Sequence, residues 1–415
     1  MKKVILLAAF CFSAQGQGDW TAWSATPGTA AKLSAKDGAT GTSLITEGGG
    51  NPAVFGGWQR LIQGIKPQQW YRFRATYSAE GVPFPARQIV ARLDWTTDSL
   101  KRAGQPDYPW STQNQGNQTL VTQDVQAPPG ANGVKVQLLL VNAPSAKVVW
   151  GDVALDPIAT PRKRSVVVSS VNLRPQRSPD PVGEFLAFME KSVPENSDVV
   201  LLPEGITVVG TSKRYTDVAE PVPGPTTGRL GQFAKQRQTW LVAGIYERDG
   251  SVVYNTSVLI DRQGRVAGKY RKVYIPREEF EGGITPGSDY PVFQTDFGTV
   301  GMMICWDVQF ADPARALALR GAELILMPIW GGNETLAKAR AIENQVFLVS
   351  SGYDHPTYIM DPNGEILSRA AERGSVATSQ IDLNRRYLDP WLGDMRARFM
   401  KELRTDTKVD PAGRR

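Results

Sequence analysis

The chain has 415 residues, of which 41% are hydrophobic and 21% are charged, and its formal net charge is +6. This length favours two domains, because a single hydrophobic core rarely serves more than about 250–300 residues. The chain has no block of like charges and no basic stripe interleaved with aromatic residues, which argues against nucleic acid as a partner.

The first residues have the layout of a secretory signal peptide. Lys2 and Lys3 precede an apolar run at positions 4–12, and small or polar residues follow at positions 13–16. The apolar run is too short to cross a bilayer as a helix, and no later segment is apolar enough to do so. We therefore predict a signal peptide at residues 1–16, no membrane span, and a mature protein that is periplasmic or secreted.

Residues 17–157 are predicted to form an all-β domain. Short alternating runs at residues 70–77, 88–95 and 134–141 predict strands, and Gly, Pro and Asn between them predict turns, as in a β-sandwich or jelly roll. The passages GWQRLIQGIKPQQWYRF and VVWGDVALDP resemble the jelly-roll carbohydrate-binding modules attached to secreted enzymes. The resemblance makes carbohydrate a candidate partner, whereas most tryptophans of a small sandwich pack in its core, which leaves a packing or oligomerisation role open. Seven of the eleven tryptophans lie in this region: Trp20, Trp23, Trp58, Trp70, Trp95, Trp110 and Trp150.

Beyond a linker at residues 158–164, the pattern changes to helices that alternate with apolar strands. Helices are predicted at residues 181–192, 229–238, 312–320 and 334–344. The apolar strands between them read DVVLLPE, TWLVAGIYE, ELILMPI and VFLVSSG. Asp249-Gly250, Gln263-Gly264 and Asn363-Gly364 are typical of hairpin turns. Strands buried on both faces with helices between them indicate an α/β layered domain, here at residues 165–384.

Cysteine and histidine are both scarce. Loss of the signal peptide would remove Cys11 and leave Cys305 as the one thiol, which is either an inert small residue or a reactive group. The single histidine, His355, stands beside a proline in a predicted loop. One histidine is too few for a histidine-rich zinc site, and a nucleophilic Cys305 needs a base other than imidazole.

Three residues with suitable chemistry stand at or just after strand ends, where α/β sheets form ligand sites. They are Glu204, Lys272 and Cys305. Each of them could also have no catalytic role. Glu204 could be a solvated carboxylate in a turn, Lys272 an exposed lysine, and Cys305 a small residue that fills the core. Together they meet the needs of acyl transfer without histidine. The carboxylate serves as the base for the thiol, and the lysine with the backbone N–H of Trp306 stabilises the oxyanion.

The signature regions of the nitrilase superfamily, the carbon–nitrogen hydrolases, are similar to three segments of this chain: VVLLPEG, KYRKVYIPREE and GMMICWDVQFADPARALALRGAELILMP. The resemblance runs from Ser165 through the tail. It implies an α-β-β-α sandwich whose sheets stack against a second subunit, hence a homodimer or higher homo-oligomer. Residues 385–415 resemble the family's C-terminal arm, which often reaches across a dimer.

The resemblance also implies roles for individual residues. The family's Glu–Lys–Cys triad maps onto Glu204, Lys272 and Cys305. A second glutamate that assists in positioning is assigned to Glu279, with Glu278 and Glu281 as alternatives. Trp306, Asp307 and Trp330 follow strand ends and are expected to line the pocket, although the tryptophans also fit rim packing. Tyr274 departs from the family, because amidase and carbamoylase branches often carry histidine there.

We therefore predict a secreted thiol hydrolase that cleaves a linear amide or an N-carbamoyl compound through a thioester, without a metal or organic cofactor. The alternatives are an inactive carbohydrate-binding or structural protein, and a nitrilase or acyltransferase of the same superfamily.

Overall fold

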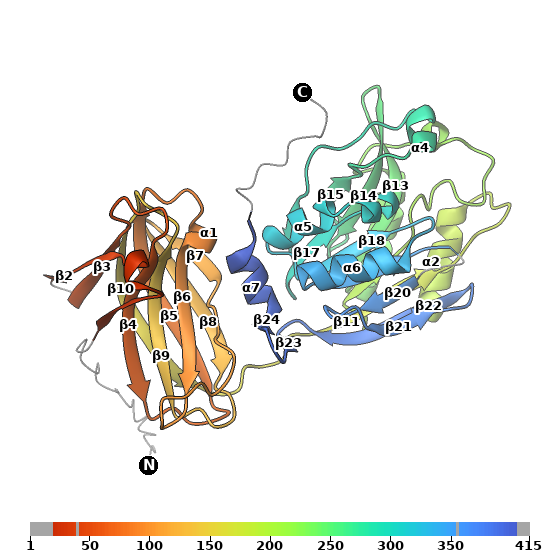
Figure 1. Cartoon of the computed structure of the whole chain (residues 1–415). Helices are drawn as coiled ribbons and strands as arrows, with labels where there is room; N and C mark the ends of the chain where they lie inside the picture. Colours follow the sequence, from red (N-terminus) through yellow and green to blue (C-terminus); the bar gives the residue numbers. More distant parts are fainter. Residues whose placement is uncertain (1–19, 39–40, 354–356, 405–415) are drawn as a thin grey trace, which may run out of the picture. The chain divides into compact units, whose positions relative to one another are not determined.

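The computed structural model describes residues 20–38, 41–353 and 357–404 (Figure 1). The chain forms two compact units, one of residues 162–387 and one that combines residues up to 161 with those from 388 onward. The predicted signal peptide and His355 lie outside the described residues. Within the described ranges, no helix has the length and apolarity needed to cross a membrane.

The first unit is a sandwich of two antiparallel sheets, with strand orders β1-β4-β9-β6 and β2-β3-β10-β5-β8-β7. Buried side chains of both sheets form one hydrophobic core, which confirms the all-β prediction. The strands are β1 (Thr21–Ser24), β2 (Lys32–Gly38), β3 (Gly41–Glu47), β4 (Phe55–Gln63), β5 (Trp70–Glu80), β6 (Ile89–Thr96), β7 (Ser111–Gln115), β8 (Gln118–Gln126), β9 (Gly133–Val141) and β10 (Lys147–Ile158).

The seven tryptophans of this unit are all at least partly buried. Trp95 and Trp150 lie in the core, and the other five are half-buried. Trp20 lies under the guanidinium of Arg60, and Trp23 packs edge-on against Phe55. None of the seven presents an exposed ring for a sugar, so carbohydrate binding stays a prediction.

The C-terminal segment belongs to the same compact unit as the sandwich. It contains β23 (Leu388–Asp389), β24 (Gly393–Asp394) and α7 (Met395–Glu402), and α7 contacts the short helix α1 (Pro85–Gln88). Lys401 Nζ on α7 donates a hydrogen bond of 3.2 Å to the carbonyl oxygen of Ile89. An arm across a dimer stays a prediction.

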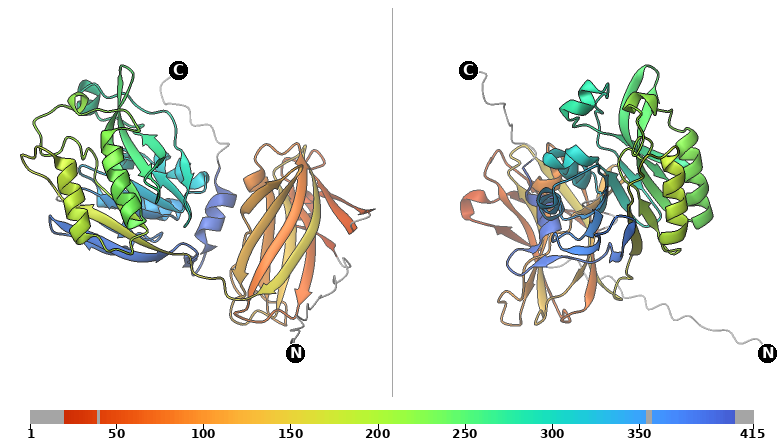
Figure 2. Two further views of the ribbon diagram at one scale, coloured as in Figure 1. Left: turned by 180° about the vertical axis from the view of Figure 1, so that it is seen from behind. Right: turned by 90° about the vertical axis from the view of Figure 1, so that its right-hand side faces the viewer.

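The second unit contains two six-stranded sheets with helices on their outer faces (Figures 1 and 2). The first sheet has the order β15-β14-β13-β12-β11-β22 and is covered by α2 and α3, and the second has the order β16-β17-β18-β19-β20-β21 and is covered by α5 and α6. This is the predicted α-β-β-α sandwich. The strands of the first sheet are β11 (Ser165–Asn172), β12 (Val199–Leu201), β13 (Trp240–Asp249), β14 (Val252–Ile260), β15 (Val266–Arg271) and β22 (Ser375–Asp382). Those of the second are β16 (Val292–Gln294), β17 (Thr299–Met302), β18 (Leu324–Pro328), β19 (Phe347–Ser351), β20 (Thr357–Met360) and β21 (Ile366–Ala370).

Helices α2 and α6 each follow a residue whose side chain accepts a hydrogen bond from an N–H group of the first turn. Asp180 caps α2 (Pro181–Ser192) by accepting a 3.0 Å hydrogen bond from the N–H of Gly183. Asn333 caps α6 (Glu334–Asn344) in the same way. Both helices have the predicted bounds, and α5 spans Asp312–Leu319. The predicted start of α3 was wrong, because the helix (Pro225–Arg237) begins one turn earlier with a proline at its first position.

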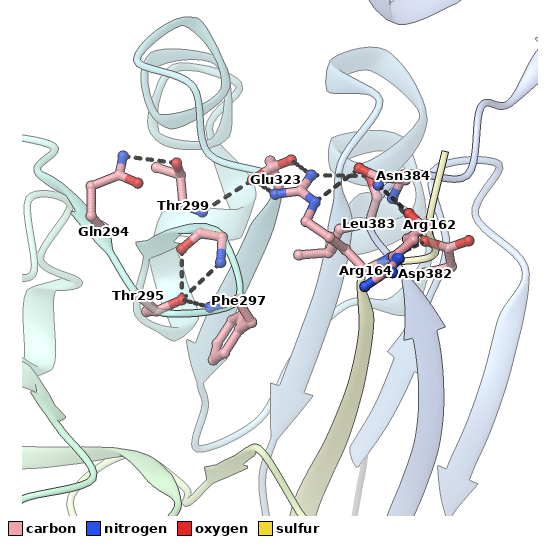
Figure 3. Close-up of polar contacts among 11 residues, drawn as sticks. Arg162, Arg164, Gln294, Thr295, Phe297, Thr299, Glu323, Asp382, Leu383 and Asn384 are labelled. Carbon is pink, nitrogen blue, oxygen red and sulfur yellow. Dashed lines mark hydrogen bonds and ion pairs between the residues drawn. The ribbon is translucent and has the colours of Figure 1, made fainter. Parts of the chain in front are cut away.

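A cluster of polar contacts joins the two sheets where the chain enters the second unit (Figure 3). Arg164, at the start of β11, forms an ion pair with Glu323, which also accepts a 3.1 Å hydrogen bond from the N–H of Thr299 on β17. The backbone N–H of Arg164 donates to Asp382 at the end of β22, and its side chain donates to Asn384. These contacts fix the ends of strands from both sheets, and the site described next lies between the sheets.

Candidate active site

Glu204 follows β12 and is buried between the two sheets. Its backbone N–H donates to the carbonyl oxygen of Ile329 beyond β18, and its carbonyl oxygen accepts a 2.7 Å hydrogen bond from the hydroxyl of Tyr353 beyond β19. Both partners directly follow strands of the second sheet. The backbone of Glu204 is therefore held by the neighbouring sheet, which fixes where its carboxylate points.

Lys272 is fully buried just after β15, and two carboxylates surround its ammonium group. Nζ lies 3.0 Å from Oε1 of Glu204 and 2.6 Å from Oε1 of Glu279. Glu279 lies on the buried side of the short helix α4 (Arg277–Glu281), whereas Glu281 forms an exposed ion pair with Arg277. Of the three glutamates considered from the sequence, Glu279 is thus the one that the structure brings to Lys272.

Cys305 begins the 3₁₀ turn η3 (Cys305–Gln309) shortly after β17. Its φ of 42° lies in the left-handed region, which non-glycine residues seldom occupy and which carries conformational strain. The thiol lies 3.3 Å from the carbonyl oxygen of Gly331 and interacts electrostatically with Glu204 and Lys272. The three residues that the sequence singled out are therefore neighbours.

The charges of this group shift one another's proton affinity. Burial and the charge of Glu204 raise the pKa of Cys305 to about 12, against the opposing effect of Lys272. Burial alone would lower the pKa of Lys272, but Glu204 and Glu279 together raise it above its ordinary value. Burial and the charge of Glu204 raise the pKa of Glu279. At neutral pH the sulfur therefore carries its proton beside a charged lysine, and it needs a base in order to attack.

One oxygen of Glu204 is suited to that task. Oε1 is hydrogen-bonded to Lys272, whereas Oε2 is buried and has no hydrogen-bond partner among the residues that the structure describes. A buried carboxylate oxygen without a donor is a strong acceptor, because the loss of its hydration is uncompensated. Oε2 can accept a proton from a thiol or a water molecule.

The three predicted pocket residues have different environments. The side chains of Trp306 and Trp330 are 42% and 39% exposed, so both are accessible to a ligand. Asp307 is fully buried, and its carboxylate accepts hydrogen bonds from Ile304 N, Tyr274 N and the hydroxyl of Tyr270. The expectation that Asp307 lines the pocket was wrong, because protein donors satisfy both its oxygens. It instead connects the turn that carries Cys305 to the segment that carries Lys272.

Comparison with known proteins identifies the family of this chain. A family model described as carbon-nitrogen hydrolase matches residues 169–389, which is more than half of the chain. The chain belongs to the carbon–nitrogen hydrolases. The omega-amidase NIT2 of Homo sapiens is 29% identical over 236 residues, which cover 50% of this chain and 84% of that protein. The omega-amidase NIT2 of Danio rerio is 27% identical over 259 residues, covering 55% and 90%.

Two solved structures are also similar to this carbon–nitrogen hydrolase. Nit3 of Saccharomyces cerevisiae, from branch 10 of the nitrilase superfamily, is 23% identical with a TM-score of 0.48, over 54% of this chain and 93% of that one. A mutant of the amidase from Nesterenkonia sp. AN1 is 22% identical with a TM-score of 0.45, over 55% and 94%. The family match makes this chain a hydrolase of carbon–nitrogen bonds.

Asn255 is a residue of this hydrolase site that the sequence analysis missed. It is fully buried in the middle of β14, and its Nδ2 donates hydrogen bonds to both Glu204 and Glu279. The available signal was the polar run Asn255–Ser257 inside an otherwise apolar strand, because a fully buried amide is rare without a specific partner.

The hydrolase fold also depends on a glycine beside Glu204. A Cβ at Gly244 on β13 would lie 2.6 Å from the Cα of Glu204. We expect Gly244→Ala to lower the free energy of unfolding by about 1–3 kcal/mol and to lower kcat, because the strand must move the base. Chemical denaturation and steady-state kinetics measure both effects.

Gly228 in α3 is the matched control, because a Cβ there would meet no heavy atom within 4 Å. Gly228→Ala should leave kcat unchanged and raise stability slightly, since alanine favours a helix. Equal effects of the two substitutions would contradict the packing account.

Proposed function

We propose that this carbon–nitrogen hydrolase cleaves a linear amide or an N-carbamoyl compound, with Cys305 as nucleophile and Glu204 as general base. The observation that carries the proposal is the buried group of four residues: Lys272 between Glu204 and Glu279, with Cys305 beside them. All four members are present with the correct chemistry, which disfavours an inactive binding protein. The relatives named as amidases support an amide over a nitrile.

In the acylation half, Oε2 of Glu204 takes the thiol proton as the sulfur forms a bond to the substrate carbonyl carbon. The negative charge moves to the carbonyl oxygen, where Lys272 Nζ and the backbone N–H of Trp306 stabilise it. Nζ has three protons and donates two of them to Glu204 and Glu279, which leaves the third for the oxyanion. As the carbon–nitrogen bond breaks, Glu204 returns its proton to the leaving nitrogen, which departs as ammonia or an amine.

In the deacylation half, the thioester on Cys305 is attacked by a water molecule. Glu204 accepts a proton from this water while the water oxygen bonds to the acyl carbon. The carbon–sulfur bond then breaks, the acid product leaves, and the proton on Glu204 passes back to the sulfur. An amine in place of water would give acyl transfer, so the nucleophile of this step distinguishes a hydrolase from an acyltransferase.

The experiment that tests the proposal measures ammonia release from a panel of linear amides, N-carbamoyl compounds and nitriles with the full chain. We expect release from at least one amide or carbamoyl compound, and an acid product even when a competing amine is added. Release from nitriles only, or products consisting only of the new amide, would favour the nitrilase or acyltransferase alternative. No release from any member of the panel would refute the proposal.

We also propose that the mature enzyme lies outside the cytoplasm, in the periplasm or the medium. The support is the charged, apolar and small-residue succession at residues 1–16. Amino-terminal sequencing of the enzyme from its host should begin near residue 17, and a start at Met1 would contradict the proposal. Carbohydrate binding by the sandwich unit and a homodimer or higher homo-oligomer stay predictions, which polysaccharide retention and light scattering of the full chain test.

A further inference from the structure

We propose that Asn255 is a positioning residue that holds the Glu204 carboxylate in the orientation in which its unpaired oxygen acts as the base. This inference rests on the proposed function, because it assigns a role to a group that contacts both glutamates of the site. The amide neither reaches the substrate carbonyl in the mechanism above nor exchanges a proton. It acts by holding Oε1 of Glu204 so that Oε2 faces the reaction.

The contacts of Asn255 involve every charged member of the buried group. Its Nδ2 donates to Oε1 of Glu204 at 2.7 Å and to Oε2 of Glu279 at 3.2 Å. Its backbone carbonyl oxygen accepts a 2.9 Å hydrogen bond from the backbone N–H of Lys272. One residue on β14 thus contacts both carboxylates and the lysine backbone.

Glu204 Oε1 receives two donors, Lys272 Nζ at 3.0 Å and Asn255 Nδ2 at 2.7 Å. Oε2 receives none from the described residues. Two donors on one oxygen prevent rotation of the carboxylate, because a turn of the group would break both hydrogen bonds and bury a second unpaired oxygen. Without the amide, Lys272 alone would hold Oε1, and the carboxylate could turn.

The amide also balances the charge of the site. Two carboxylates share a single ammonium group in a buried position, and the hydrogen bond from Asn255 lowers the pKa of Glu279 against the effects of burial and Glu204. An amide donates to both acids without adding charge. Its removal should therefore raise the proton affinity of the pair. Five other titratable groups interact with these two acids, from the 3₁₀ turn η2 (Tyr215–Asp217), β13, η3 and the segments after β15 and β19. They are Tyr215, Tyr246, Cys305, Lys272 and Tyr353.

The test compares Asn255→Leu, which keeps the size of the side chain and removes both donors, with the wild type over a range of pH. We expect kcat/KM at neutral pH to fall by about 10- to 100-fold, as for the loss of a hydrogen bond to a charged group. The acid limb of the kcat/KM profile should move to higher pH, because the carboxylate pair then binds a proton more tightly. A profile that falls by the same factor at every pH would overturn the inference.

Asn172 is the matched control, since it is another fully buried asparagine of the same sheet and donates a 3.0 Å hydrogen bond to the carbonyl oxygen of Ala370. Asn172→Leu should lower stability without moving the acid limb. If Asn255→Leu does not fold, Asn255→Ser keeps one small donor and should show a smaller shift in the same direction. An equal shift in the Asn172 variant, or no shift in a folded Asn255 variant, contradicts the positioning role.

A second readout separates this inference from the proposed function. The rate of alkylation of Cys305 by iodoacetamide requires loss of the thiol proton and needs no amide substrate. The acid limb of the pH profile of this alkylation rate should also move to higher pH in Asn255→Leu. If the wild type hydrolyses no amide but this limb moves, the proposed function fails and the positioning role stands. If the wild type is active and the limb does not move, the positioning role fails alone.

Discussion

Replacement of Cys305 by alanine is expected to lower kcat/KM for the best amide by roughly 10⁴- to 10⁶-fold, the range seen when a covalent nucleophile is removed. The sulfur is the atom that bonds to the acyl carbon, and neither Glu204 nor Lys272 can replace it while they hold each other. Stability should change little, because the residue is only partly buried. Steady-state kinetics and thermal denaturation of the same preparations measure the two effects.

The matched control is Cys305→Gly, which removes the sulfur and relieves the backbone. The φ of 42° at this position is compatible with glycine at no steric cost, whereas a side chain there carries strain of about 1 kcal/mol or more. This variant should be as inactive as Cys305→Ala, and its melting temperature should be higher than that of Cys305→Ala. Activity within tenfold of the wild type in either variant would show that Cys305 is not the nucleophile.

The second large effect is expected from Lys272→Met, which should lose activity and about 3–5 kcal/mol of stability. Removal of one partner from a buried ion pair leaves the other charges uncompensated, and here two carboxylates, Glu204 and Glu279, would face each other without their ammonium group. Without the ammonium group, the pKa of Glu279, which burial and the charge of Glu204 already raise, would rise further. The loss of stability should therefore be smaller at acid pH, where both acids are protonated, and grow as the pH rises.

Lys269→Met is the control for this prediction. The side chain of Lys269 is 38% exposed and pairs with the buried Glu247, which keeps its ion pair with Arg271 and its hydrogen bond from Thr256 when Lys269 is replaced. The loss should be about 1 kcal/mol or less. Equal losses in the two variants, or a loss in Lys272→Met that does not depend on pH, would contradict the account of the buried group.

The sequence predicts best those features that depend on local pattern. Helix α6 and the three hairpin turns follow from their capping and turn residues, and Gly250, Gly264 and Gly364 adopt the positive φ that these turns require. Helix α3 was predicted to begin too late, because the prolines and glycines before Arg229 are typical of a loop. Pro225 at the first helical position needs no N–H partner, so the helix tolerates it.

The site shows the same limit. Glu204 and Cys305 could be found because each stands just after an apolar strand, and Lys272 because it lies in a recognisable segment. Asn255 could not be found in this way, since it lies inside a strand and its role depends on acids far along the chain. Asp307 follows a strand end too, but its turn directs it inward to donors near Lys272, a contact that only the folded chain contains.

We propose that catalysis passes through an acyl group on Cys305, with Glu204 as the base. A direct test mixes the Glu204→Gln enzyme with a p-nitrophenyl ester, whose leaving group departs without a proton from Glu204, and quenches in acid after one equivalent of p-nitrophenol has formed. Mass spectrometry of the peptide that carries Cys305 should then show one acyl group on this residue, and the Cys305→Ala protein should release no burst. An unmodified Cys305 peptide after one equivalent of p-nitrophenol has been released would contradict the account.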